Sequence, residues 1–263
     1  MTSPSSTRHE PGLVTPELLA LTRDLGRTER DLVILAEGNT SQRLDDGRLV
    51  VKASGARMRD VTAEDFVTVE VEPLMELVTD ERATQADLTR ALVAADAEGN
   101  VARRGSIETL VHAAVQAVAP VPFVGHTHPT EVVGLLSSAR AEESFTQAAY
   151  SDEAVVIGKP LFVPYAQPGI DLGRVYHRCL VEYADREGAL PQLVLLANHG
   201  IVAIAPTAEG VDAISEMAVK AAAVRRIAYS VGGLVPLTEE AVSKFFARDD
   251  ISERRGNIAA GRL

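Results

Sequence analysis

The short apolar run Leu193–Ala197 constrains the fold more than any other segment, because the polar turn Asn198-His199-Gly200 follows it directly. Short apolar runs bounded by turn signals are typical of buried strands. A polar turn at the carboxyl end of such a strand is a favoured position for binding and catalysis. The sequence therefore predicts a buried central strand with a candidate functional turn at its end.

Other strand and helix patterns are mixed along the chain without a regular alternation. Strand-like patterns lie at 41–44 and 48–53, on either side of the turn Asp45-Asp46-Gly47, and at 66–71, 121–128 and 161–164. Helical patterns follow the cap signal Thr15-Pro16 and cover 86–98, 107–118, 207–229 and 238–247. We therefore expect one α/β domain over residues 13–263, with a largely antiparallel or mixed central sheet. The polar residues 1–12 are expected to form a disordered tail.

Composition and charge narrow the classes of protein further. The 263 residues carry a formal net charge of −11, which disfavours nucleic acids and anionic membranes as partners but leaves a locally positive pocket possible. Apolar stretches are too short to span a bilayer, and residues 1–12 lack the apolar core of a signal peptide. The single cysteine, Cys179, excludes an intramolecular disulfide and a CxxC metal site. We expect a soluble, cytoplasmic protein.

Histidines and one glutamate form the sharpest candidate site. In the strand-like His126-Thr127-His128 the two imidazoles point to one face, where they can bind one ion. Glu108 lies four residues before His112 on a candidate helix, and His199 follows the apolar strand. Taken singly, each has an ordinary structural explanation, such as a polar strand end or a first-turn glutamate. Together they indicate a three-histidine metal centre with a nearby carboxylate, a donor set that suits Zn²⁺.

Polar turns supply candidate anion-binding groups. Asn39 and the pair Ser54-Gly55 offer backbone N–H groups and short polar side chains, and Ser106 precedes Glu108 at an expected helix N-terminus. Lys52 lies two residues before Ser54 and would add a positive charge. Each of these residue types is also common in ordinary turns, so each signal is weak by itself.

The order of these motifs resembles the class II aldolase/adducin family. The segments that carry the resemblance are Gly38-Asn39-Thr40-Ser41, Lys52-Ala53-Ser54-Gly55, Ser106-Ile107-Glu108, His126-Thr127-His128-Pro129 and Asn198-His199-Gly200. It covers roughly residues 15–245. The resemblance implies an α/β/α fold with a central, largely antiparallel sheet, a Zn²⁺ site and a homotetramer with sites at subunit interfaces.

The resemblance also implies roles for individual residues. His126, His128 and His199 match the metal ligands, and Glu108 matches the acid/base. Asn39, Ser54, Gly55 and Ser106 match positions that hold the substrate phosphate, and Tyr150 aligns with a tyrosine that a neighbouring subunit contributes as a second proton donor. Two departures stand out: Ile107 replaces the second of two serines found in a family aldolase, and Lys52 matches a lysine of a family epimerase.

By this resemblance we expect a Zn²⁺-dependent aldolase, with Mn²⁺ or Co²⁺ as substitutes. It would cleave a ketose, in particular a ketose 1-phosphate, to dihydroxyacetone phosphate and an aldehyde through a metal-stabilised enediolate. A sugar-phosphate 4-epimerase and a sugar-acid-phosphate decarboxylase use the same chemistry and are the alternatives within the family. An adducin-like interaction module without catalysis is the alternative of another class, although such a module needs no metal ligands.

Overall fold

The computed structural model describes residues 6–95 and 100–259, which form one layered α/β domain. Its strands build a ten-stranded sheet in the order β6-β5-β1-β4-β3-β2-β7-β10-β9-β8. The strands are β1 (Thr7–Arg8), β2 (Asn39–Arg43), β3 (Leu49–Lys52), β4 (Phe66–Val69), β5 (Val93–Ala95), β6 (Val101–Arg104), β7 (Phe123–Thr127), β8 (Leu161–Val163), β9 (Leu193–Leu196) and β10 (Gly200–Ala205). Only the β1–β5 and β8–β9 pairs are parallel among these described strands. The expected largely antiparallel sheet is therefore confirmed.

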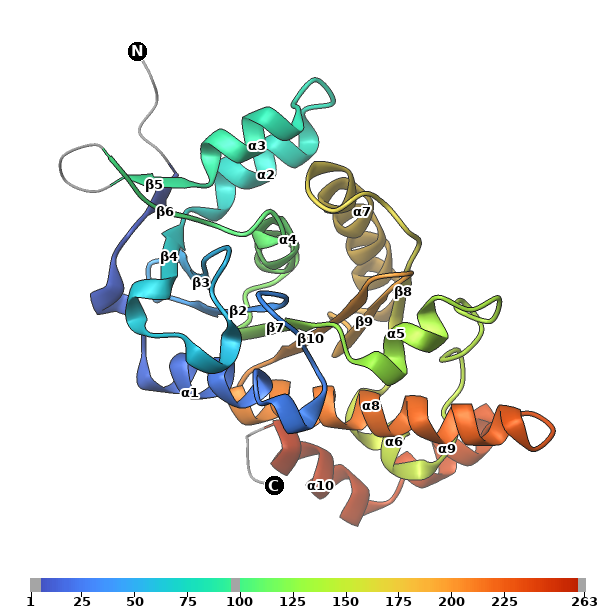
Figure 1. Cartoon of the computed structure of the whole chain (residues 1–263). Coiled ribbons are helices and arrows are strands. Elements are labelled where there is room, and N and C mark those ends of the chain that lie inside the picture. Colours follow the sequence, from blue (N-terminus) through green and yellow to red (C-terminus); the bar gives the residue numbers. More distant parts are fainter. Residues whose placement is uncertain (1–5, 96–99, 260–263) are drawn as a thin grey trace.

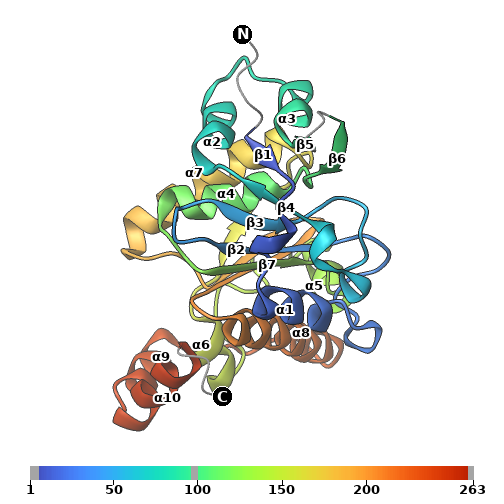
Figure 2. The ribbon, with the colours of Figure 1, turned by 90° about the vertical axis from the view of Figure 1, so that its left-hand side faces the viewer.

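Helices cover both faces of the sheet (Figures 1 and 2). The helices are α1 (Pro16–Leu25), α2 (Val71–Thr79), α3 (Gln85–Ala91), α4 (Thr109–Val118), α5 (Thr130–Leu136), α6 (Ser151–Ile157), α7 (Ile170–Glu187), α8 (Ala208–Ser230), α9 (Glu239–Phe246) and α10 (Asp249–Ala259). Figure 2 shows α2, α3, α4 and α7 on one face and α1 and α8 on the other. Within the described ranges, no helix is both long enough and apolar enough to span a membrane.

Strands β9 and β10 are apolar throughout and are buried from both sides of the sheet. In β9 and β10, Leu193, Leu195 and Ile201 pack into the core cluster that includes α1 and α8. The alternate residues Val194 and Val202 pack into the cluster on the α4 and α7 side. This alternation follows from the two-residue repeat of a strand. Leu193–Leu196 thus form the predicted buried strand, β9, but it lies next to the edge strand β8 and not at the centre of the sheet.

The cap of α1 and the turn between β2 and β3 form as the sequence predicts. Thr15 caps α1, since its Oγ1 accepts a hydrogen bond from the Leu18 N–H at 3.1 Å, and Pro16 occupies the first helical position. The turn Asp45-Asp46-Gly47 joins the antiparallel strands β2 and β3, and Gly47 adopts a φ of +87°.

Most predicted boundaries are shifted by one or two residues, and at three places another element forms where the sequence did not predict it. The predicted helix 86–98 is α3, which ends at Ala91 and is followed by β5, while residues 96–98 lie outside the described part. The predicted strand 66–71 ends at Val69, and helix α2 begins at Val71. Within the tail 1–12, expected to be disordered, Thr7–Arg8 form β1 between β4 and β5. Pairing with distant strands, which local sequence patterns do not encode, explains the differences at β1 and β5.

Candidate metal centre

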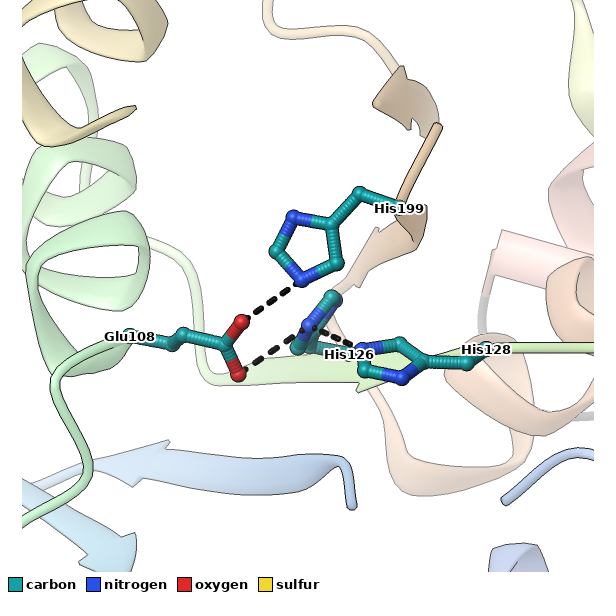
Figure 3. Close-up of side chains that lie close together, drawn as sticks. All are labelled: Glu108, His126, His128 and His199. Carbon is teal, nitrogen blue, oxygen red and sulfur yellow. Dashed lines mark hydrogen bonds and ion pairs between the residues drawn. The ribbon is translucent and has the colours of Figure 1, made fainter. Parts of the chain in front are cut away.

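Three histidines and one glutamate meet beside the centre of the sheet (Figure 3). His126 lies in β7, and His128 follows the end of that strand. Strand β10 pairs with β7, with Ile201 opposite Thr127, so His199 in the β9–β10 turn lies against both. Glu108 immediately precedes α4. One ligand atom from each of the four residues lies within 4.8 Å of the others, so they could hold one metal ion.

The donor atoms face one another directly. The Nε2 atoms of His126 and His128 are 2.9 Å apart. Glu108 reaches two of the imidazoles, with Oε1 2.7 Å from His199 Nε2 and Oε2 3.2 Å from His126 Nε2. Figure 3 shows the carboxylate directed at this pair of rings. Three imidazole nitrogens and one carboxylate are a donor set that fits a divalent ion such as Zn²⁺.

Groups outside the cluster orient two of its rings. His126 donates a hydrogen bond from Nδ1 to the Ile201 carbonyl at 2.8 Å, and in the neutral ring this tautomer leaves Nε2 unprotonated and free to act as a ligand. The Nδ1 atom of His128 lies 3.6 Å from a carboxylate oxygen of Glu37. The sequence reasoning missed Glu37, although it lies just before Gly38-Asn39 and carries a carboxylate.

The electrostatics of the cluster favour an ionised carboxylate beside imidazoles. Burial alone would raise the Glu108 pKa, but the charges and hydrogen bonds of His126 and His199 outweigh it and hold that pKa well below its usual range. Burial lowers the pKa of His126 but Glu108 more than offsets this, so the net shift is upward. Burial, and then the neighbouring His126, lowers the pKa of His128 to about 3, which keeps that ring in its neutral, ligating form.

The turn that carries His199 is closely packed. Asn198 adopts a φ of +54°, a left-handed conformation that asparagine tolerates better than most residues. Gly200 leaves no space for a side chain, because a Cβ there would lie 2.4 Å from the Thr127 carbonyl oxygen and 2.6 Å from His128 Cδ2. The turn Asn198-His199-Gly200 can therefore bring His199 against His126 and His128 only because residue 200 is glycine.

His112 is hydrogen-bonded to Asn39 and Ser41, which lie next to the site. It is completely buried, and burial lowers its pKa to about 3, so its ring is neutral. Its Nε2–H donates to Asn39 Oδ1, and its Nδ1 accepts from Ser41 Oγ at 2.7 Å. Asn39 in turn donates from Nδ2 to Glu108 Oε2 at 3.3 Å. His112 thus orients Asn39 and, through it, Glu108, a role that the spacing of Glu108 and His112 did not reveal.

The candidate anion-binding residues lie on neighbouring segments. Ser106 Oγ accepts hydrogen bonds from Asn39 Nδ2 and the Glu108 N–H, each at 3.3 Å. The turn Ser54-Gly55 is exposed, and Gly55 has a φ of +84°. It is tied to the Ser106 segment, since the Ser54 N–H donates to the Arg104 carbonyl at 2.9 Å. The structure therefore brings Asn39 and Ser106 to Glu108, with Ser54-Gly55 on the adjacent segment.

Lys52 is buried and is therefore not an exposed cation beside the Ser54-Gly55 turn. Its side chain is 1 % exposed, and Nζ donates to the carbonyls of Ala53 at 3.2 Å and Ala56 at 2.6 Å. Burial lowers its pKa to about 8. Lys52 thus holds the two ends of the Ser54-Gly55 turn together.

Tyr150 makes its contacts with helix α8. It precedes α6, its hydroxyl donates to Met217 Sδ at 3.0 Å, and the Lys220 ammonium lies 5.6 Å from its ring centre. Burial raises its pKa above the usual range. The contacts of Tyr150 within one chain are therefore with α8 and not with the histidine cluster.

The fold and the cluster together define a class of protein, a layered α/β domain with a histidine and glutamate site that could hold a metal. Residues 16–225 match the family model described as the Class II Aldolase and Adducin N-terminal domain. The match spans most of the sequence, so the chain belongs to the class II aldolase and adducin family. This confirms the family inferred from the motifs. A search of curated proteins finds no significant match.

Solved structures show the same fold. YgbL of Escherichia coli, a putative aldolase/epimerase/decarboxylase, is 20% identical with a TM-score of 0.62, over 86% of this chain and 94% of that one. An L-fuculose 1-phosphate aldolase is 20% identical with a TM-score of 0.59, over 87% and 93% of the two chains. The N-terminal class II aldolase domain of a Thermoplasma acidophilum protein is 20% identical with a TM-score of 0.59, over 79% and 92%.

Proposed function

We propose that this protein is a divalent-metal-dependent aldolase that cleaves a ketose, in particular a ketose 1-phosphate, to dihydroxyacetone phosphate and an aldehyde. The observation that carries the proposal is the carboxylate of Glu108 directed at the imidazoles of His126 and His199, with His128 alongside. A purely structural or adducin-like module has no need of such a cluster of ligand donors. We place the enzyme in the cytoplasm, as a homotetramer.

His126, His128 and His199 would hold the ion, with Zn²⁺ first and Mn²⁺ or Co²⁺ as substitutes. When bound, a divalent ion supplies Lewis-acid stabilisation of negative charge on the oxygens of a sugar. Of the three rings, His126 is held in the ligating tautomer by its hydrogen bond to the Ile201 carbonyl.

Glu108 is the group that moves the proton. In cleavage the C3–C4 bond breaks, its electron pair stays with C3, the C4 hydroxyl loses its proton and becomes the aldehyde oxygen, and C3 gains a proton. A carboxylate is suited to this transfer if it lies within hydrogen-bond reach of the substrate carbon. Glu108 is 12 % exposed at its side chain, so it can meet a substrate while Asn39 fixes its orientation.

The phosphate would lie on Asn39, Ser54, Gly55 and Ser106. In a tetramer, Tyr150 of a neighbouring chain would serve the departing aldehyde oxygen, because its contacts within its own chain are with α8. A 4-epimerase and a decarboxylase would use the same residues on other substrates, and the YgbL description names both activities for that relative.

The test is an assay of the Zn-loaded protein on ketose 1-phosphates, ketose 5-phosphates and acidic sugars, with triose, epimer and CO₂ scored separately. Triose formation from a ketose 1-phosphate supports the proposal, whereas formation of only an epimer or only CO₂ would show that the enzyme is an epimerase or a decarboxylase instead.

We expect Glu108→Gln to keep its metal but lose about two or more decades in kcat. Glu182→Gln on the exposed side of α7 is the matched control and should retain full activity.

A further inference from the structure

The three histidines of the candidate metal centre differ in what meets the Nδ1 atom of each ring. His126 Nδ1 donates to the Ile201 carbonyl at 2.8 Å. His199 Nδ1 is buried and has no hydrogen-bond partner among the described residues. His128 Nδ1 lies 3.6 Å from Glu37 Oε2. A carboxylate on the outer nitrogen fixes the tautomer of a ligating imidazole and makes the ring a stronger ligand.

The Glu37 carboxylate is held in place by its own turn. The same Oε2 accepts a hydrogen bond from the Ile34 N–H at 3.0 Å, and the Glu37 N–H donates to the Ile34 carbonyl at 3.1 Å. Between them, Leu35 adopts a φ of +54°, a left-handed conformation that is unfavourable for a leucine. Strained backbone of this kind concentrates at functional sites. The turn therefore holds the carboxylate beside His128 at a local cost in free energy.

The chain on either side of this turn is packed against the backbone of the two β7 histidines. Before the turn, the buried Leu32 accepts a hydrogen bond at its carbonyl from the His128 N–H at 2.8 Å. After the turn, Gly38 adopts a φ of +69°, and a Cβ there would lie 2.8 Å from the His126 carbonyl oxygen. These contacts keep the Glu37 carboxylate at a fixed place relative to His128.

The negative charge of Glu37 is not neutralised by a basic side chain. Across residues 6–95 and 100–259, its one ion-pair contact is with the ring of His128, which is neutral. A divalent ion held by three neutral imidazoles and Glu108 would retain a net positive charge. Glu37 is the carboxylate beside the cluster that can balance it.

We propose that Glu37 is a positioning residue of the metal centre, which keeps the proton of His128 on Nδ1 and leaves Nε2 as the ligand atom. This inference rests on the proposed function. Coupling between two groups is reciprocal, so an ion that binds more tightly because of Glu37 also stabilises the Glu37 turn by the same free energy. The Ile34 N–H donates to that carboxylate and therefore reports on the coupling.

The first test measures the Zn²⁺ affinity of the full chain by competition with a chelating dye. Glu37→Gln keeps an oxygen that can accept from the Ile34 N–H but removes the charge. It should weaken Zn²⁺ binding about 10–100-fold, the usual effect of losing a group that orients a metal ligand. The metal-free variant should melt at the wild-type Tm. Glu17→Gln, at an exposed position of α1, removes the same charge and should bind Zn²⁺ as tightly as the wild type.

Hydrogen exchange of the Ile34 N–H supplies a readout that a merely structural role would not move. In the wild type, Zn²⁺ should slow this exchange by about the same factor by which Glu37→Gln weakens Zn²⁺ binding. In Glu37→Gln, Zn²⁺ should leave the exchange of Ile34 nearly unchanged.

Wild-type Zn²⁺ affinity in Glu37→Gln would overturn the inference. An equal loss in Glu17→Gln would also overturn it, because net charge alone would then explain the effect. A lowered Tm of metal-free Glu37→Gln, without slowing of the Ile34 exchange by Zn²⁺ in the wild type, would show that Glu37 supports the fold instead. The proposed function fails differently, through the absence of cleavage activity in a protein whose Zn²⁺ affinity still depends on Glu37.

Discussion

Gly200→Ala probes the packing that brings His199 to the other histidines. The added Cβ would lie 2.4 Å from the Thr127 carbonyl oxygen, whereas ordinary contacts begin at 3.4 Å, so β7 and the β9–β10 turn must separate by about 1 Å. The strands resist this, because Ile201 pairs with Thr127. Overpacking of this kind costs about 1–3 kcal/mol. For a chain of this size that lowers Tm by about 2–10 °C.

The same substitution should weaken metal binding by about 10–100-fold, the usual effect of disturbing groups that orient ligands, because the new Cβ also lies 2.6 Å from His128 Cδ2. Calorimetric melting and competition with a metal-binding dye measure the two effects. Gly134→Ala is the control. No atom lies within 4 Å of its added Cβ, and in helix α5 it should stabilise by about 0.5–1 kcal/mol. Wild-type Tm and metal affinity in Gly200→Ala would refute the reasoning.

Further predictions concern Lys52 and Tyr150. Burial lowers the pKa of Lys52 in the folded state to about 8, whereas in the unfolded chain it is about 10.4. Between these two pH values the unfolded chain binds more protons than the folded one. The free energy of unfolding of the wild type should therefore rise with pH relative to that of Lys52→Met. The gain, up to about 3 kcal/mol, is measured by urea unfolding at several pH values, and a pH-independent difference would contradict it. Glu108→Gln and Tyr150→Phe should both be weakly active alone and regain activity when their subunits are mixed and reassembled. Continued inactivity after demonstrated subunit exchange would place Tyr150 within its own site or outside catalysis.

Features encoded by neighbouring residues were predictable from the sequence. Thr15-Pro16 starts α1, Asp45-Asp46-Gly47 makes the β2–β3 turn, and Leu193–Ala197 contains β9. Each depends on turn chemistry or on burial from both sides, which residues a few positions apart reveal. The layered fold with a mostly antiparallel sheet followed from these patterns and from the family motifs.

Features that depend on distant partners were not predictable. Thr7–Arg8 become a strand only because β4 and β5 lie on either side of them. Lys52 is buried by the turn that its own ammonium closes, and His112 supports Asn39 across 73 positions of sequence. The motifs identified the residues that the structure gathers around Glu108, but not the hydrogen bonds that orient them.

The most direct test of the account is the metal content of the purified protein. Elemental analysis after growth with Zn²⁺ should find about one ion per chain in the wild type. His177→Ala, a histidine of α7 outside the cluster, should keep that ion, whereas His126→Ala, His128→Ala and His199→Ala should each lose it while remaining folded. A wild type without bound metal, or full occupancy in the three cluster variants, would contradict the claim that these histidines form a metal centre facing Glu108.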